Sequence, residues 1–150
     1  MALLLKGEKI VKNDEEVDAA EALEGKIVGL YFSAGWCGPC RQFTPKLKRF
    51  YQKVQAAGKK FEIVFVSRDR EEEDLIEYFD EHQGEWTYLT FGNPKIQELL
   101  EKYEVKTVPT FRIIKSDGTV IVEDGRNEVA EKGADGAVDL FENWEAFSEM

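Results

Sequence analysis

The sequence contains little cysteine and histidine. Of its 150 residues only two are Cys and one is His. A disulfide framework normally uses several bridges across longer loops, and a bridge between Cys37 and Cys40 would constrain the unfolded chain little. Structural zinc sites need four ligands, more than two Cys and a single His supply. Redox chemistry is therefore a better explanation for the cysteine pair than stability or zinc.

Signals for export, lipidation and membrane insertion are also missing. The start M-A-L-L-L-K is too short for a secretory hydrophobic region and has no basic segment before it. Ala2 stands where N-myristoylation requires a glycine. No apolar run approaches the ~18 residues of a membrane span. These features predict a soluble intracellular protein that is cytoplasmic, and no basic cluster separates cytosol from nucleus.

Positive charge is scarce relative to negative charge. The chain has 20 Lys and Arg against 30 Asp and Glu, a net charge of −10. This excess argues against nucleic acid and against an anionic membrane surface as partners. Hydrophobic residues make up 43% of the chain, enough for a core, and the length fits one domain. We expect a single domain over 1–150, with a hairpin or strand over 1–13 as an extension.

Hydrophobic periodicity divides the chain into alternating strands and helices. Apolar runs at Lys26–Ser33 and Phe61–Ser67 indicate strands buried on both faces. The helical pattern between them, which contains Pro45 and ends at Gly58, makes a βαβ unit with parallel strands. A later S-D-G turn indicates an antiparallel hairpin. The order predicts an α/β fold in which a central mixed sheet carries helices on both faces.

The other predicted elements follow the same signals. Leu75, Ile76 and Phe79 are expected to face the core from one of the helices. The predicted elements are two short strands within 3–11 around Gly7 and Glu8, helices over 14–24, 71–82, 93–101 and 135–147, a short strand over 86–91, and the hairpin strands 110–115 and 119–123.

The segment W-C-G-P-C contains both cysteines, follows a buried strand and opens a helix. A helix N-terminus offers unpaired N–H groups and a partial positive charge, which stabilise an anion. Because the thiolate is the attacking species, Cys37 at the helix start is the expected nucleophile. Cys40, one turn inward, is expected to be more shielded and to resolve the mixed disulfide. Gly38 and Pro39 keep the turn tight, and Arg41 adds a positive charge.

Two further features are expected beside the dithiol. Trp36 would shield the cysteine pair and offer a flat apolar contact, with a core position as the alternative. The segment T-V-P-T precedes a strand, where proline is tolerated at the first residue. Base rates alone favour a trans bond between Val108 and Pro109.

The strand, W-C-G-P-C, the following helix and the later V-P-T resemble the thioredoxin superfamily, whose active-site motif W-C-G-P-C matches at every position. The segments F-V-S-R-D-R-E-E-E-D-L, W-T-Y-L and D-G-R-N-E-V are similar to the nucleoredoxin and tryparedoxin branch, over roughly residues 20–147. The resemblance implies a thioredoxin fold and a cis Pro109 packed against the dithiol. It also implies that the Val108 backbone pairs with an extended substrate segment.

One position departs from the thioredoxin pattern. Thioredoxins carry a buried acid six residues before the first Cys, where this chain has Tyr31. Another group must then accept the proton when Cys40 attacks. Asp69 is the candidate because it follows the end of a strand, where α/β sites gather, and bulk water is the alternative. The branch resemblance suggests a polar surround made of Tyr31, Ser33, Arg41, Asp69 and Arg126. For Arg126 the alternative is a solvated loop charge.

Together these observations predict a thiol–disulfide oxidoreductase of the nucleoredoxin and tryparedoxin type that reduces protein disulfides in cell redox homeostasis. Its redox-active centre would be the Cys37–Cys40 disulfide, so no bound cofactor and no metal are expected. The expected partners are protein disulfide substrates and an upstream reductase or dithiol donor. The alternative is a redox-sensing binding module whose affinity for a partner depends on the Cys37–Cys40 disulfide.

Overall fold

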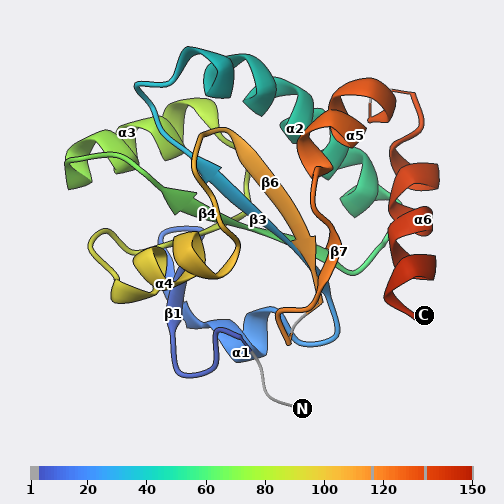
Figure 1. Cartoon of the computed structure of the whole chain (residues 1–150), viewed down its shortest axis with the longest axis horizontal. Coiled ribbons are helices and arrows are strands. Elements are labelled where there is room, and N and C mark those ends of the chain that lie inside the picture. The colour runs from blue at the N-terminus through green and yellow to red at the C-terminus, as the bar shows by residue number, and fades with distance from the viewer. Residues whose placement is uncertain (1–3, 116, 134, 150) are drawn as a thin grey trace.

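A seven-stranded mixed sheet forms the centre of the computed structural model, which describes residues 4–115, 117–133 and 135–149 (Figure 1). The strand order is β2-β1-β5-β4-β3-β6-β7. In chain order the elements are β1 (Lys9–Lys12), β2 (Glu15–Asp18), α1 (Ala19–Ala22), β3 (Ile27–Ser33), α2 (Gly38–Ala56), β4 (Phe61–Ser67), α3 (Glu72–His82), β5 (Thr87–Leu89), α4 (Pro94–Lys102), β6 (Thr110–Ile114), β7 (Val120–Val122), α5 (Gly125–Lys132) and α6 (Ala137–Ser148).

The predicted βαβ unit is confirmed. Strands β3 and β4 pair in parallel over their whole length, from Ile27 opposite Phe61 to Ser33 opposite Ser67. On the other side β3 pairs antiparallel with β6, which forms the predicted hairpin with β7. Ser116 of the S-D-G turn lies outside the described residues. Because β3 lies inside the sheet, between β4 and β6, the cysteine motif that follows its carboxyl end lies near the middle of the sheet rather than at an edge strand.

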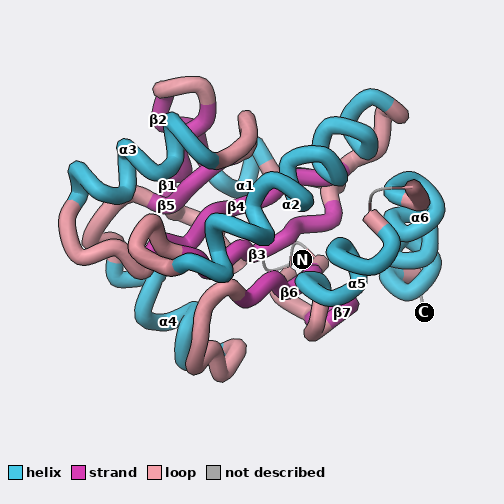
Figure 2. Tube along the Cα trace, turned by 90° about the horizontal axis from the view of Figure 1, so that it is seen from above, coloured by secondary structure: helices cyan, strands magenta, loops and turns pink. Residues whose placement is uncertain are grey.

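Helices cover both faces of the sheet, as the sequence predicts. Buried side chains of α2, α3, α5 and α6 pack on one face in a cluster rich in aromatic residues. Side chains of α1 and α4 pack on the other face, mostly against aliphatic residues of β3 and β4. Viewed from above, α2 and α5 lie in front of the strands (Figure 2). Among the described residues no helix combines the length and the apolar character that crossing a membrane would require.

The N-terminal prediction was wrong in detail. The hairpin is formed by β1 and β2 rather than by two strands around Gly7, and its turn is at Asn13 and Asp14, which both have positive φ (52° and 65°). The helix expected over 14–24 is reduced to Ala19–Ala22. Pairing with β1 holds residues 15–18 extended, because tertiary context overrides the helical preference of an acidic segment.

Two further differences concern helices. Residues 125–132 form α5, which the sequence did not indicate because only Gly125 and Val129 of this segment are buried, too few for a periodic apolar pattern. In α3, Ile76 is 36% exposed instead of facing the core, and Tyr78 occupies a buried position that was not predicted.

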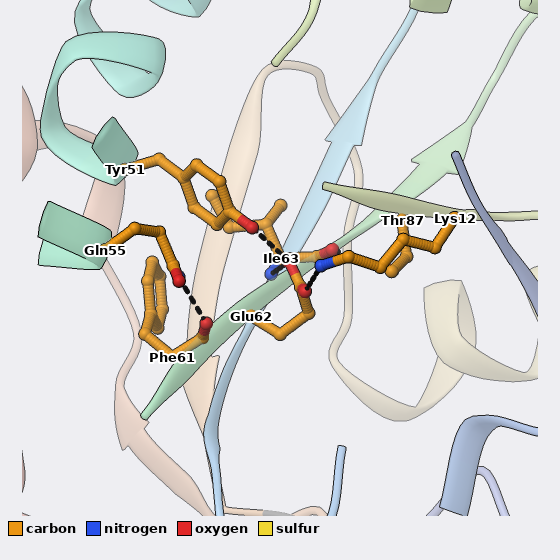
Figure 3. Close-up of polar contacts among 7 residues, drawn as sticks. All are labelled: Lys12, Tyr51, Gln55, Phe61, Glu62, Ile63 and Thr87. Atoms are coloured by element: carbon orange, nitrogen blue, oxygen red, sulfur yellow. Dashed lines mark hydrogen bonds and ion pairs between the residues drawn. The ribbon is translucent and has the colours of Figure 1, made fainter. Parts of the chain in front are cut away.

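A buried carboxylate joins the N-terminal hairpin to the rest of the sheet. Glu62 of β4 is 1% exposed; it accepts a hydrogen bond from Tyr51 of α2 and forms an ion pair with Lys12 of β1 (Figure 3). The main-chain N–H of Ile63 donates to the same carboxylate. In the pairing of β3 with β4, Glu62 lies opposite Val28, three residues along the strand from the position opposite Tyr31. It therefore anchors β1 and does not take the place of the acid that thioredoxins carry at the Tyr31 position.

Candidate active site

The cysteine motif lies between the end of β3 at Ser33 and the start of α2 at Gly38. Cys37 is the N-cap residue of α2, and its Sγ accepts a hydrogen bond from the main-chain N–H of Cys40 at 3.2 Å. Pro39 occupies the first turn, where its missing N–H costs no intrahelical hydrogen bond. This geometry stabilises negative charge on the Cys37 sulfur through a main-chain donor and the helix dipole.

The two cysteines differ in their surroundings, although both are free thiols in this structure. The exposed fraction is 6% for Cys37 and 0% for Cys40. Burial, with the neighbouring Cys37 thiol, raises the pKa of Cys40 to about 12, while a hydrogen bond with the Ser33 side chain acts in the opposite direction. At neutral pH Cys40 is therefore a buried thiol that has to lose its proton before it can attack.

The Val108–Pro109 segment lies directly against the dithiol. The peptide bond between the two residues is cis, as the resemblance implies. The Cys37 Sγ atom lies 3.6 Å from the Val108 carbonyl oxygen, and Val108 packs against the cluster of Ala34, Cys37 and Cys40. The chain segment before β6 thus forms one wall of the site.

Trp36 forms an exposed apolar surface next to Cys37. Its side chain is 63% exposed, and its indole N–H donates to the carbonyl oxygen of Arg68 at 3.3 Å. The hydrogen bond holds the ring against the loop between β4 and α3 rather than in the core. Gly38 has open space where a Cβ would stand, so this side of the motif is also accessible.

Behind Cys40 the structure places a cluster of hydroxyl groups instead of an acid. Tyr31 hydrogen-bonds to Thr44 across 2.6 Å, and Thr44 also donates to the Cys40 carbonyl oxygen at 2.8 Å. The Tyr78 hydroxyl contacts Thr44 at 2.9 Å and Ser33 at 2.8 Å. Burial raises the pKa of Tyr31 and of Tyr78, so both phenols stay protonated.

Sequence reasoning missed Thr44 and Tyr78 as members of this cluster. Thr44 follows Cys40 by four residues, so helical spacing alone places both on one face of α2 and could have indicated it. Tyr78 is on α3 and reaches the site only because that helix packs beside α2. No local sequence signal connects it with the cysteines.

Asp69 supports the loop that carries the cysteines. It is 9% exposed; one carboxylate oxygen accepts the Gly35 N–H at 2.8 Å and the other accepts the Ser67 hydroxyl at 2.7 Å. A Cβ on Gly35 would stand 3.1 Å from the Tyr78 Cβ and 3.4 Å from this carboxylate, so a glycine lets the loop approach α3 closely. Both oxygens of Asp69 are thus engaged in holding the turn before Cys37.

Arg41 bridges the loop and α3. Its Nε donates to the Gly35 carbonyl oxygen at 2.5 Å, and its Nη1 lies 3.2 Å from the Nε2 of His82. The guanidinium also lies over the Tyr78 ring, 5.9 Å from its centre. His82 is the last residue of α3 and hydrogen-bonds to Arg41.

Arg126 is not a loop residue. It lies half-buried in the first turn of α5, and among the described residues no side-chain hydrogen bond or ion pair is found for it. The structure therefore brings together Ser33, Trp36, Cys37, Cys40 and Val108, with Tyr31, Arg41 and Asp69 one contact away. Within the described residues, no side-chain hydrogen bond or ion pair joins Arg126 to this group. Over the described part of the chain, no group of three or more His, Cys, Asp or Glu is arranged to hold a metal ion.

Comparisons with known proteins agree with this geometry. Residues 25–120 match the Thioredoxin-like family. The chain is 39% identical over 121 residues to nucleoredoxin of Danio rerio, covering 80% of this chain but only 28% of that protein. It is 42% identical over 112 residues to tryparedoxin of Trypanosoma brucei brucei, covering 73% and 76% of the two chains.

A solved structure matches nearly the whole chain. The crystal structure of thioredoxin from Wuchereria bancrofti superimposes with a TM-score of 0.83 and 45% sequence identity, and the match covers 97% of this chain and 99% of the other. The family match, the two relatives and the shared fold lead to one assignment: the chain belongs to the thioredoxin superfamily of oxidoreductases, in its nucleoredoxin and tryparedoxin branch.

Proposed function

We propose that this protein is a dithiol–disulfide oxidoreductase that reduces protein disulfides. The Cys37 thiolate attacks a substrate disulfide, forms a mixed disulfide and releases the first substrate thiolate. Cys40 then loses its proton and attacks the Cys37 sulfur. This step closes the Cys37–Cys40 disulfide, and the second substrate thiolate leaves and takes up a proton.

The observation that carries the proposal is the asymmetry of the pair. Cys37 caps α2 and receives the Cys40 N–H, whereas Cys40 is fully buried and its pKa is raised. Cys37 is therefore the attacking cysteine. Cys40 reacts only after the mixed disulfide has formed, and its target is then the Cys37 sulfur. Trp36 and the Val108 backbone would receive the substrate segment next to Cys37.

The pair supplies the two electrons itself, so the cycle requires no bound cofactor. It does require an upstream reductase or dithiol donor that returns the Cys37–Cys40 disulfide to the dithiol, and a reducing compartment such as the cytoplasm would favour that state.

Insulin reduction in the presence of a recycling reductase or dithiol donor tests the proposal. An enzyme turns over many insulin disulfides per cysteine pair. A redox-sensing binding module would stop after about one equivalent, and that result would contradict the proposal.

A further inference from the structure

The hydroxyl groups behind Cys40 form one continuous chain. Ser33 contacts Tyr78 at 2.8 Å, Tyr78 contacts Thr44 at 2.9 Å, and Thr44 contacts Tyr31 at 2.6 Å. The hydroxyl chain ends at the Cys40 carbonyl oxygen, to which Thr44 donates. At its other end Ser33 acts on the Cys40 thiol, because its side chain lowers the pKa of that thiol. All four side chains are between 0% and 2% exposed, so bulk water does not compete for these groups.

Each hydroxyl has a single hydrogen, which limits how the chain can be arranged when Cys40 is a thiol. Thr44 then donates to the Cys40 carbonyl oxygen, Tyr78 donates to Thr44 and Ser33 donates to Tyr78. Ser33 is then left with a lone pair that is available to the Cys40 S–H. Tyr31 donates to Thr44.

The same oxygen positions also allow the reverse direction. Thr44 can turn its hydrogen to Tyr78, Tyr78 can donate to Ser33, and Ser33 can donate to the Cys40 sulfur. The Cys40 carbonyl oxygen keeps its place in the α2 hydrogen-bond ladder and its 3.4 Å contact with the Tyr31 hydroxyl. Every hydroxyl hydrogen again has an acceptor, and only hydroxyl rotations are needed.

We propose that Ser33, Tyr78 and Thr44 form a reversible hydroxyl chain that accepts from the Cys40 thiol and donates to the Cys40 thiolate in the resolving step. The inference rests on the proposed function, because that step is the one in which Cys40 changes its protonation state. The three residues are positioning residues: Ser33 acts on the sulfur, Tyr78 acts through Ser33 and Thr44 acts through Tyr78.

The hydroxyl chain does not carry the proton of Cys40 away, because the group at its far end, Thr44, is not an acid. The proton of Cys40 leaves through the mouth of the site to water or to the departing substrate thiolate. In the balanced step the bond between Cys37 and the substrate sulfur breaks, the Cys37–Cys40 bond forms, and the substrate leaves as a thiol. The reversed chain stabilises the negative charge on Cys40 during that step, in place of a buried acid.

The test uses the reduced protein and 5,5′-dithiobis(2-nitrobenzoate) in a stopped-flow instrument. Attack by Cys37 releases one coloured thionitrobenzoate, and resolution by Cys40 releases the second. The first phase depends on reagent concentration and the second does not. The two steps are therefore measured separately in one experiment.

We expect Ser33→Ala to slow the second phase about tenfold at neutral pH and to leave the first phase unchanged, because a hydrogen bond to a charged group is lost. The pH profile of the second phase should move about one pH unit higher. Tyr78→Phe should slow the second phase about threefold, because the donor that polarises Ser33 is lost. The double variant should be no slower than Ser33→Ala, since Tyr78 acts only through Ser33.

Tyr103→Phe is the matched control. Tyr103 is a buried tyrosine whose hydroxyl donates to the Gly118 carbonyl oxygen at 2.6 Å in the cluster on the other face of the sheet. Tyr103→Phe should lose about as much stability as Tyr78→Phe and leave the rates of both phases unchanged.

Three results would overturn the inference. The first is an unchanged second phase in Ser33→Ala; the second is slowing by Tyr103→Phe equal to that by Tyr78→Phe. The third is additive slowing in the double variant, which would indicate two separate structural defects. If the wild-type protein released only one thionitrobenzoate, the proposed function itself would fail, and the inference with it.

Discussion

The main-chain N–H of Cys40 donates a hydrogen bond to the Sγ atom of Cys37, across 3.2 Å. This hydrogen bond stabilises negative charge on the Cys37 sulfur. The Cys40 sulfur, in contrast, is buried and shielded from solvent. Because a thiolate is the attacking species, the two cysteines of this protein are unequal before any substrate binds.

The two single serine variants should therefore differ in kind. Cys40→Ser keeps the attacking thiolate but removes the resolving thiol, so mixed disulfides with a protein substrate should accumulate and dissolve when a small thiol is added. Cys37→Ser should neither reduce nor capture that substrate. Non-reducing gels of both variants beside the wild type measure this. Capture by Cys37→Ser alone would reverse the roles.

Trp36 offers a test of substrate contact without a change in folding. Its ring is 63% exposed and makes one hydrogen bond, to the Arg68 carbonyl oxygen. Trp36→Ala should raise KM for a protein disulfide about tenfold, because an exposed aromatic anchor is removed, and shift the melting temperature little. Steady-state insulin reduction and thermal unfolding provide the two readouts. A large fall in the melting temperature with an unchanged KM would instead place the ring in a structural role.

The Lys12–Glu62 ion pair should contribute to stability through burial of the carboxylate. Lys12→Met leaves Glu62 with Tyr51 and a main-chain donor but without its cation. We expect a loss of about 2 kcal/mol in the free energy of unfolding, below the usual range for a fully buried pair because the Lys12 side chain is 32% exposed. Urea denaturation measures it.

Lys59→Met is a matched control for that experiment. Lys59 contacts Glu142 and Glu145, whose side chains are 53% and 41% exposed, so its removal should change stability little. Equal losses in the two lysine variants would contradict a special role for the buried carboxylate.

Stability should also fall in alkaline solution. Burial raises the pKa of Tyr103 to about 12, above the ordinary value of 10.0, and raises the pKa of Cys40 from 9.0 to about 12. A group with a raised pKa in the folded state keeps its full contribution below the unfolded pKa and loses it as the pH rises toward the folded pKa. The urea midpoint should therefore decrease from about pH 9 upward.

Tyr103→Phe should flatten that decrease above about pH 10, since one of the groups responsible is removed. The comparison requires urea midpoints for both proteins from pH 8 to 11. A decrease of the same steepness in both would show that Tyr103 does not contribute to the pH dependence.

Local patterns in the sequence determined the fold class and the position of the dithiol. The apolar runs of β3 and β4, the helical spacing of α2 and the W-C-G-P-C segment between β3 and α2 are contiguous features, so each can be recognised without knowing its neighbours in space. The same holds for the N-cap of α4, where the Asn93 side chain accepts the Lys95 N–H as expected for Asn followed by Pro.

Only the tertiary structure decided which side chains surround Cys40 and how the N-terminal segment pairs. Tyr78 is separated from Ser33 by 45 residues and Glu62 from Lys12 by 50, and such contacts depend on how helices pack and strands align rather than on any periodicity. Residues 15–18 have a helical preference, yet β1 holds them as a strand. Long-range pairing contributes more free energy than local propensity in these segments, and a single sequence does not display it.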